Sequence, residues 1–211
     1  TTSRVTMPNL QLTHVGKIDD NHYYSVYAGL LESMYGGIGG EWLYRPFASR
    51  LALGMDVNYV KQRDFHQSFS FKDAGTQSGY RVATGHATAY WDTGWNDVLA
   101  TVSVGRYLAR DSGMTVSLAR TFRNGLTAGA FATKTNISSA QFGEGSFDKG
   151  LFLTIPFDAV SPRSTAGAGV FAWRPLLRDG GAMLEKSVSL YGMTRARSNR
   201  TLDVQIGRAH V

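Results

Sequence analysis

Cysteine is absent from this 211-residue chain, which excludes disulfide bonds and thiolate metal sites. That absence is compatible with the cytoplasm and with the cell envelope. Long hydrophobic runs are also missing. No window approaches about 18 uninterrupted apolar residues, so a membrane-spanning helix is excluded. Charged residues make up only 18% of the chain, and its net charge of +6 comes from scattered Lys and Arg. Scattered charges are typical of solvated loops, and nucleic acid is not expected as a partner.

Glycine and aromatic residues are plentiful, with 24 Gly and 12% aromatic residues. Sheets that bend, close or face lipid use this mixture. Apolar and polar residues alternate most clearly over residues 51–60. There, Leu51, Leu53, Met55, Val57 and Tyr59 fall on one face, and small or polar residues fall mainly on the other. This period of two predicts a half-buried strand.

The same period recurs along the chain and predicts an all-β fold of about ten antiparallel strands, with no amphipathic helix. We expect the strands at residues 23–31, 37–44, 51–62, 80–91, 98–108, 114–122, 126–136, 149–157, 165–173 and 186–195.

The expected connections alternate in length. Short ones lie at residues 45–50, 93–97, 123–125 and 158–164. The intervening ones, at 32–36, 64–79, 109–113, 137–148 and 175–185, include three long loops. The pair Asn124 and Gly125 favours a type I′ hairpin. Many strands have about 9–12 residues, longer than in most soluble sheets and enough for a tilted crossing of a bilayer. We therefore predict an up-and-down meander that forms an outer-membrane β-barrel or part of a larger one.

Two other interpretations fit the same strands. A general diffusion porin shares the barrel pattern, and a soluble glycan-binding β-sandwich would use the aromatic residues to fill its core. We expect residues 1–22 to be poorly ordered or a partial preceding segment, and residues 23–205 to be the barrel region. Residues 206–211, IGRAHV, resemble a translated sequencing adapter and are expected to be a non-native tail.

Several segments resemble the YjbH or GfcD family of outer-membrane proteins linked to exopolysaccharide and capsule export. They include GLLESMYGGIGGEWLYRPF (29–47), LALGMDVNYVKQRDF (51–65), TGHATAYWDTG (84–94), VGRYLARDSG (104–113), GAFATKTN (129–136) and FGEGSFDKGLFLTIPFD (142–158). The resemblance implies a lipoprotein of the bacterial outer membrane with a β-barrel. Its implied partners are outer-membrane lipid, a polysaccharide and other export proteins. It brings no known catalytic residues.

No pattern in the sequence predicts catalysis, a cofactor or a metal site. The histidines lack a metal-ligand spacing such as HExxH, and no GxSxG marks a nucleophile. The chain is therefore expected not to be an enzyme. Candidate glycan contacts in the Gly-rich loop are Phe142, Glu144, Phe147 and Asp148, although the acidic pair also suits a loop that caps its own backbone. Candidate lumen-facing residues are Glu41, Asp56, Asn58 and Lys134.

Overall fold

The computed structural model describes residues 7–64, 71, 79–137, 148–156, 168–173 and 181–194. Ten strands form one antiparallel sheet in which each strand pairs with its neighbour in sequence, from β1 to β10. The strands are β1 (Leu10–Lys17), β2 (His22–Leu30), β3 (Tyr35–Tyr44), β4 (Leu51–Gln62), β5 (Arg81–Asp92), β6 (Val98–Arg106), β7 (Ser112–Thr121), β8 (Thr127–Thr135), β9 (Asp148–Pro156) and β10 (Ala168–Trp173). Within the described ranges, the short helix α2 (Leu190–Met193) follows them.

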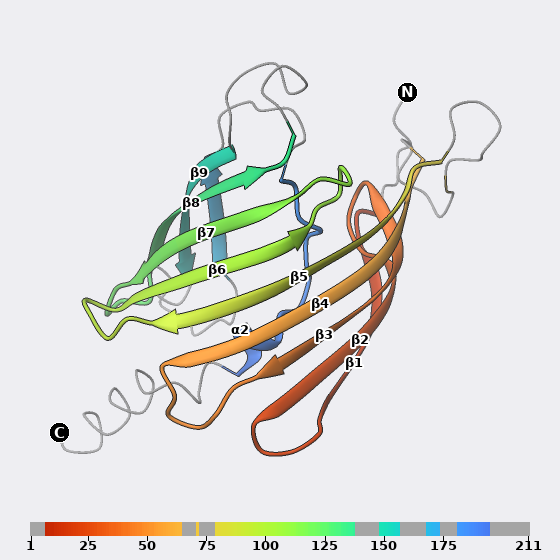
Figure 1. The fold of residues 1–211 in the computed structure, drawn as a ribbon. Coiled ribbons are helices and arrows are strands. Elements are labelled where there is room, and N and C mark those ends of the chain that lie inside the picture. Colours follow the sequence, from red (N-terminus) through yellow and green to blue (C-terminus); the bar gives the residue numbers. More distant parts are fainter. Residues whose placement is uncertain are drawn as a thin grey trace.

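The prediction of an all-β, antiparallel, up-and-down meander of about ten strands is confirmed. The sheet curves strongly but is not closed, and among the described strands β1 and β10 each pair on one side alone (Figure 1). No helix in the described ranges is long and apolar enough to cross a membrane.

The two faces of the sheet differ in the exposure and polarity of their side chains, as β4 shows. Its residues alternate strictly between exposed and buried from Leu51 to Val60. Val57 is 64% exposed on the outer face, whereas Asn58 is 5% exposed on the concave face. On β4, the large apolar side chains thus point mainly outward, while the polar Asp56 and Asn58 are buried on the concave face. In most soluble proteins, large apolar side chains are buried and charged ones are exposed.

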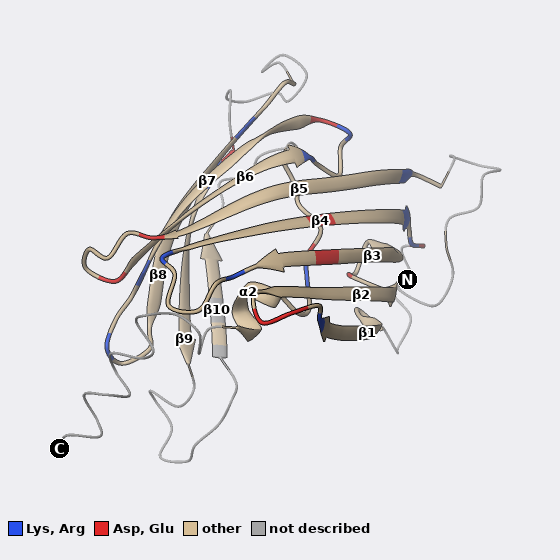
Figure 2. Ribbon diagram, turned by 60° about the horizontal axis from the view of Figure 1, so that its bottom comes forward, with Lys and Arg blue, Asp and Glu red and all other residues tan. Residues whose placement is uncertain are grey.

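The outer face is apolar over neighbouring strands. Exposed large hydrophobic residues on it include Val26, Ile38, Leu53, Met55, Val57, Val102, Val104, Met114, Val116, Leu118 and Leu151. Figure 2 shows Lys, Arg, Asp and Glu mainly near strand ends and connections, with long stretches of strand free of charge between them. A β-sandwich would cover this face with a second sheet, but the described strands all belong to one sheet. The sandwich interpretation is therefore not supported.

The concave face carries two small apolar clusters, both completed by the segment after β10. Leu184 packs with Val60 and Val82 in the first, and Leu190 packs with Leu43 in the second. Burying each leucine contributes about 1.5–3 kcal/mol. The core thus lies between the sheet and this segment.

The connections predicted to be short between β3 and β4, between β5 and β6 and between β7 and β8 are short. The connection between β9 and β10, predicted at 158–164, lies outside the described residues. The turn between β7 and β8 differs from the predicted type. At the hairpin between β7 and β8, Phe122 N–H donates to the Leu126 carbonyl oxygen at 2.8 Å. Gly125 has φ +83°, but Asn124 has no positive φ. A type I′ turn requires positive φ at both central residues, so the hairpin uses a three-residue connection with a left-handed glycine instead.

Two predictions about where strands lie are wrong. Residues 10–17, placed in the segment before the sheet, form β1 in register with β2. The strand expected at 186–195 does not form, because this segment runs along the concave face and ends in α2. Residues 206–211 lie outside the described residues.

Close approach of backbones explains two of the glycines. A methyl group on Gly37 of β3 would overlap the carbonyl oxygen of Tyr59, and one on Gly113 of β7 would overlap that of Lys134. Any larger residue would force the paired strands apart. These glycines thus allow the close pairing of β3 with β4 and of β7 with β8.

Candidate functional site

The segment 181–194, called the strap here, crosses the concave face of the sheet (Figure 1). At one end, Gly181 N–H donates to the Asp111 carboxylate at 2.9 Å. Farther along, Leu190 N–H donates to the Glu41 carboxylate at 3.1 Å. At the other end, Arg45 donates to the Tyr191 carbonyl oxygen at 2.9 Å. The strap is therefore fixed to the sheet over its whole length.

Lys186 of the strap pairs with two buried carboxylates. Its ammonium lies 3.0 Å from an Asp56 oxygen and 3.5 Å from a Glu41 oxygen. The second Asp56 oxygen lies 3.5 Å from His86 Nδ1. The register pairs Glu41 of β3 with Asp56 of β4, and Asp56 with His86 of β5, so all three share one face. Isolated carboxylates at this depth would be very unfavourable, and Lys186 offsets that cost.

A chain of side-chain hydrogen bonds continues from this cluster. Tyr27 O–H donates to the Asn58 side-chain oxygen at 2.5 Å. The Asn58 amide donates to Asp56 at 2.9 Å and to the Thr84 hydroxyl at 3.3 Å. Such networks hold buried polar groups in one arrangement because each partner satisfies the next.

The candidate lumen residues do not all lie together. Glu41, Asp56 and Asn58 are buried on the concave face. Lys134 is exposed on the other face, where the register pairs it with Met114. The period of two explains this, because the inward residue of β8 at this level is the neighbouring Thr133, which is buried.

Three of the four candidate glycan contacts lie outside the described residues: Phe142, Glu144 and Phe147. Asp148 is described, and begins β9 opposite Thr133 of β8. Sequence reasoning missed Lys186, because its partners lie far away in the chain. It also gave no role to His86, although the alternation of β5 placed His86 on one face with Thr84 and Thr88.

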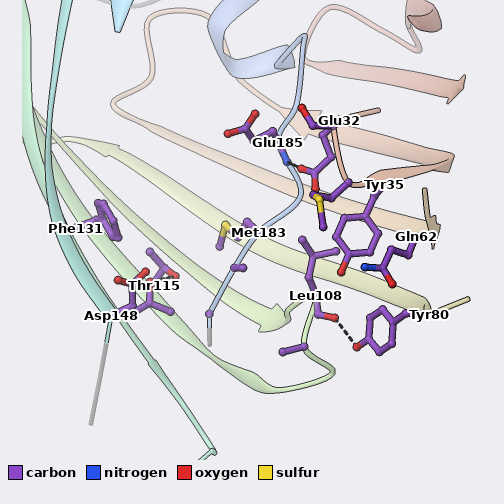
Figure 3. Close-up of a pocket in the computed structure, with 16 residues that line it drawn as sticks. Glu32, Tyr35, Gln62, Tyr80, Leu108, Thr115, Phe131, Asp148, Met183 and Glu185 are labelled. Atoms are coloured by element: carbon purple, nitrogen blue, oxygen red, sulfur yellow. Dashed lines mark hydrogen bonds between the residues drawn. The ribbon is translucent and has the colours of Figure 1, made fainter. Parts of the chain in front are cut away.

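A cavity of about 860 Å³ opens between the strap and the sheet. Figure 3 shows Tyr35, Gln62 and Tyr80 on one side of it, and Phe131 with Thr115 and Asp148 on the other. The strap contributes Met183 and Glu185, and the connection between β2 and β3 contributes Glu32. Connections and strand ends from the long-loop end of the sheet thus build this cavity.

Glu32 ties the strap to the rim of the cavity. Its carboxylate accepts a hydrogen bond from the backbone N–H of Glu185, with 3.0 Å between the nitrogen and the oxygen. Burial raises the pKa of the Glu32 carboxyl, and the hydrogen bond from Glu185 partly offsets that rise. The hydrogen bond joins the connection after β2 to the strap at this end.

The concave face presents groups that can contact a polar ligand. Its groups are carboxylates, hydroxyls, amides and aromatic rings, which recognise polar ligands by hydrogen bonding and ring contacts. Among the described residues, no group of three or more His, Asp or Glu side chains is arranged to hold a metal ion.

Sequence comparison assigns this curved all-β chain to a class of exopolysaccharide biosynthesis proteins. The family model described as "Exopolysaccharide biosynthesis protein YbjH" matches residues 1–196. The chain therefore belongs to the YjbH family. It is 45% identical over 195 residues to the "Uncharacterized lipoprotein YjbH" of Escherichia coli (strain K12).

That alignment covers 92% of this chain but 28% of the E. coli protein. The chain thus spans less than a third of the length of this relative. No solved structure matches the chain.

Removing the Lys186 charge tests whether it holds the strap. We expect Lys186→Met to lower the free energy of unfolding by about 3 kcal/mol, because Glu41 and Asp56 lose their shared cation. Equilibrium unfolding in guanidinium chloride measures the change. Lys17→Met is the matched control, since Lys17 forms an exposed pair with Asp20 and its loss costs about 0–1 kcal/mol. Equal effects of the two substitutions would contradict the role of Lys186.

Proposed function

We propose that this chain forms part of the wall of an outer-membrane β-barrel that helps an exopolysaccharide cross or assemble at the bacterial outer membrane. In this proposal the protein binds and guides the glycan, and catalysis takes place elsewhere. The single observation that carries the membrane assignment is the outer face of β4, where Leu51, Leu53, Met55, Val57 and Tyr59 are all exposed.

The free energy of transferring apolar side chains from water to lipid supports this assignment. In water, an extended apolar face of this kind would be unfavourable and prone to association. Against acyl chains it is favourable, and the strands satisfy one another's backbone groups, as a membrane environment requires. The lengths of β4 and β5, 12 residues each, suit a tilted crossing of a bilayer.

Two observations support the view that strands from outside this chain complete the barrel. Among the described strands, the edges β1 and β10 each pair on one side alone, and the E. coli relative is much longer than this chain. Edge strands expose unpaired N–H and C=O groups, which are very costly in lipid. β1 and β10 would then pair with strands from elsewhere in a longer protein. The polysaccharide part of the proposal, and a location in the cell envelope, rest on membership of the YjbH family and on the lipoprotein name of the E. coli relative.

The strap argues against a general diffusion porin. A porin needs a wide aqueous channel inside its barrel, whereas the strap occupies the concave face and is held there by Lys186. This arrangement favours a dedicated ligand path over free diffusion of small solutes.

The lipid assignment predicts a depth-dependent cost of charge on the outer face. Val57 lies near the middle of β4 and Leu51 at its start. We expect Val57→Arg to reduce the free energy of folding into bilayers by about 2–4 kcal/mol, and Leu51→Arg by about 0–1 kcal/mol. Urea titration of the protein in lipid vesicles measures both. The same small cost at both positions would contradict lipid exposure of mid-strand residues.

The export assignment predicts where the glycan accumulates. In a bacterium that carries the full-length gene, we expect its deletion to lower the exopolysaccharide outside the cell and to retain polymer within the envelope. Fractionation followed by sugar analysis measures both pools, and re-expression of the gene serves as the control. An unchanged glycan distribution together with slower uptake of small solutes would instead favour the porin.

A further inference from the structure

We propose that the 860 Å³ cavity between strap and sheet is a saccharide subsite that accepts neutral or amino-bearing sugar units and rejects those carrying carboxylate or phosphate. The inference deepens the proposed function and rests on it, because it names the glycan chemistry that this part of the protein selects. It depends on the size, the aromatic walls, the charge and the position of the cavity.

The size and lining of the cavity suit a small oligosaccharide. Its volume lies within the range of about 300–1,000 Å³ that is usual for ligand pockets. Tyr35 and Tyr80 form an edge-to-face pair with ring centroids 6.5 Å apart, and Phe131 lies on the other side (Figure 3). An aromatic face carries negative potential. The partly positive C–H groups of a pyranose ring are therefore attracted to it.

The polar groups of the cavity match sugar hydroxyls. Gln62 contributes an amide that both donates and accepts, and carboxylates of Glu185 and Asp148 accept hydrogen bonds from O–H groups. Hydrogen bonds to an ionised carboxylate are short and strong. The Tyr80 hydroxyl is already engaged, because it donates to the Leu108 carbonyl oxygen at 2.6 Å. Its role is to hold the ring in place.

The charge of the lining determines which sugars fit. The described residues of the lining include the three acidic side chains Glu32, Asp148 and Glu185, and none of them is Lys, Arg or His. Arg110 lies close by, with its guanidinium 5.1 Å from the centre of the Tyr80 ring, but is not part of the lining. Carboxylates repel a uronate or phosphate in a partly desolvated site and attract an ammonium group. An acidic cavity thus selects against anionic glycans.

The position of the cavity agrees with a role in glycan passage. Its residues come from the connections β2–β3 and β6–β7, from the strand ends of β4 and β8, and from the start of the strap. These all lie at the end of the sheet that carries the long connections. In outer-membrane barrels the longer loops face the outside of the cell. A subsite here would meet the polymer at the outer mouth.

The direct test is binding of three tetrasaccharides to the full-length protein in detergent, measured by isothermal titration calorimetry. The probes are β-linked glucose, glucosamine and galacturonate tetramers. We expect the glucose and glucosamine tetramers to bind at least about tenfold more tightly than the galacturonate tetramer, a difference of about 1.4 kcal/mol. Preferred binding of galacturonate, or no binding of any probe, would overturn the proposal.

Two variants assign the binding to this cavity. We expect Phe131→Ala to weaken binding of the glucose tetramer about tenfold or more, whereas Phe122→Ala, an exposed aromatic outside the cavity, leaves it unchanged. Glu185→Gln keeps the shape of the side chain and should narrow the preference for glucosamine over galacturonate. Equal affinities of the Phe131 and Phe122 variants, or an unchanged preference in Glu185→Gln, would place the binding elsewhere.

The two proposals fail in distinguishable ways. A protein that supports exopolysaccharide export in cells but binds none of the tetramers disproves the subsite alone. A protein that binds the neutral tetramers but whose deletion leaves export unchanged contradicts the proposed function. Thermal unfolding of each variant in the same detergent shows whether a loss of binding reflects a loss of folding.

Discussion

Charge neutralisation on the concave face is the interaction on which the rest of this structure depends. Glu41 and Asp56 lie side by side on β3 and β4, where both side chains are nearly fully buried. Two adjacent carboxylates in such a place repel each other and lose their hydration. Lys186, 130 or more residues farther along the chain, supplies the cation. The pairing brings the strap onto the sheet, and with it Leu184 and Leu190 into the apolar clusters.

The fixed strap in turn shapes the concave side of the molecule. The charged groups Glu41 and Asp56 lie on this side with Lys186, whereas the outer side carries apolar residues such as Met55 and Val57. The start of the strap, with Met183 and Glu185, forms one wall of the acidic cavity. The pairing of Lys186 thus fixes the strap that lines the cavity, and both the proposed lipid contact and the proposed saccharide subsite build on this arrangement.

The fold was largely predictable because alternation in β4 and β7 is a local property that any reader of the sequence can follow. β1 was missed because it has few apolar residues. Leu12 and Val15 are three positions apart, so they do not follow the period of two that marks a strand. The prediction of a strand at 186–195 was wrong because a segment that packs on a sheet also carries apolar residues at intervals. Such spacing can be mistaken for the alternation of a strand. The faces of Glu41 and Asp56 followed from alternation, but the pairing with Lys186 and the cavity depend on contacts between distant segments, which no local pattern encodes.

Contact of the outer face with lipid, and its absence at the concave face, can be measured on β7. The chain has no cysteine, so single cysteines at Val116 and Ser117, neighbours on opposite faces of β7, can carry spin labels without background. In vesicles, collision with oxygen reports lipid and collision with a water-soluble nickel complex reports water. We expect the Val116 label to collide mainly with oxygen and to be shielded from nickel, unlike the Ser117 label. Equal access of nickel to both labels would contradict contact of the outer face with lipid.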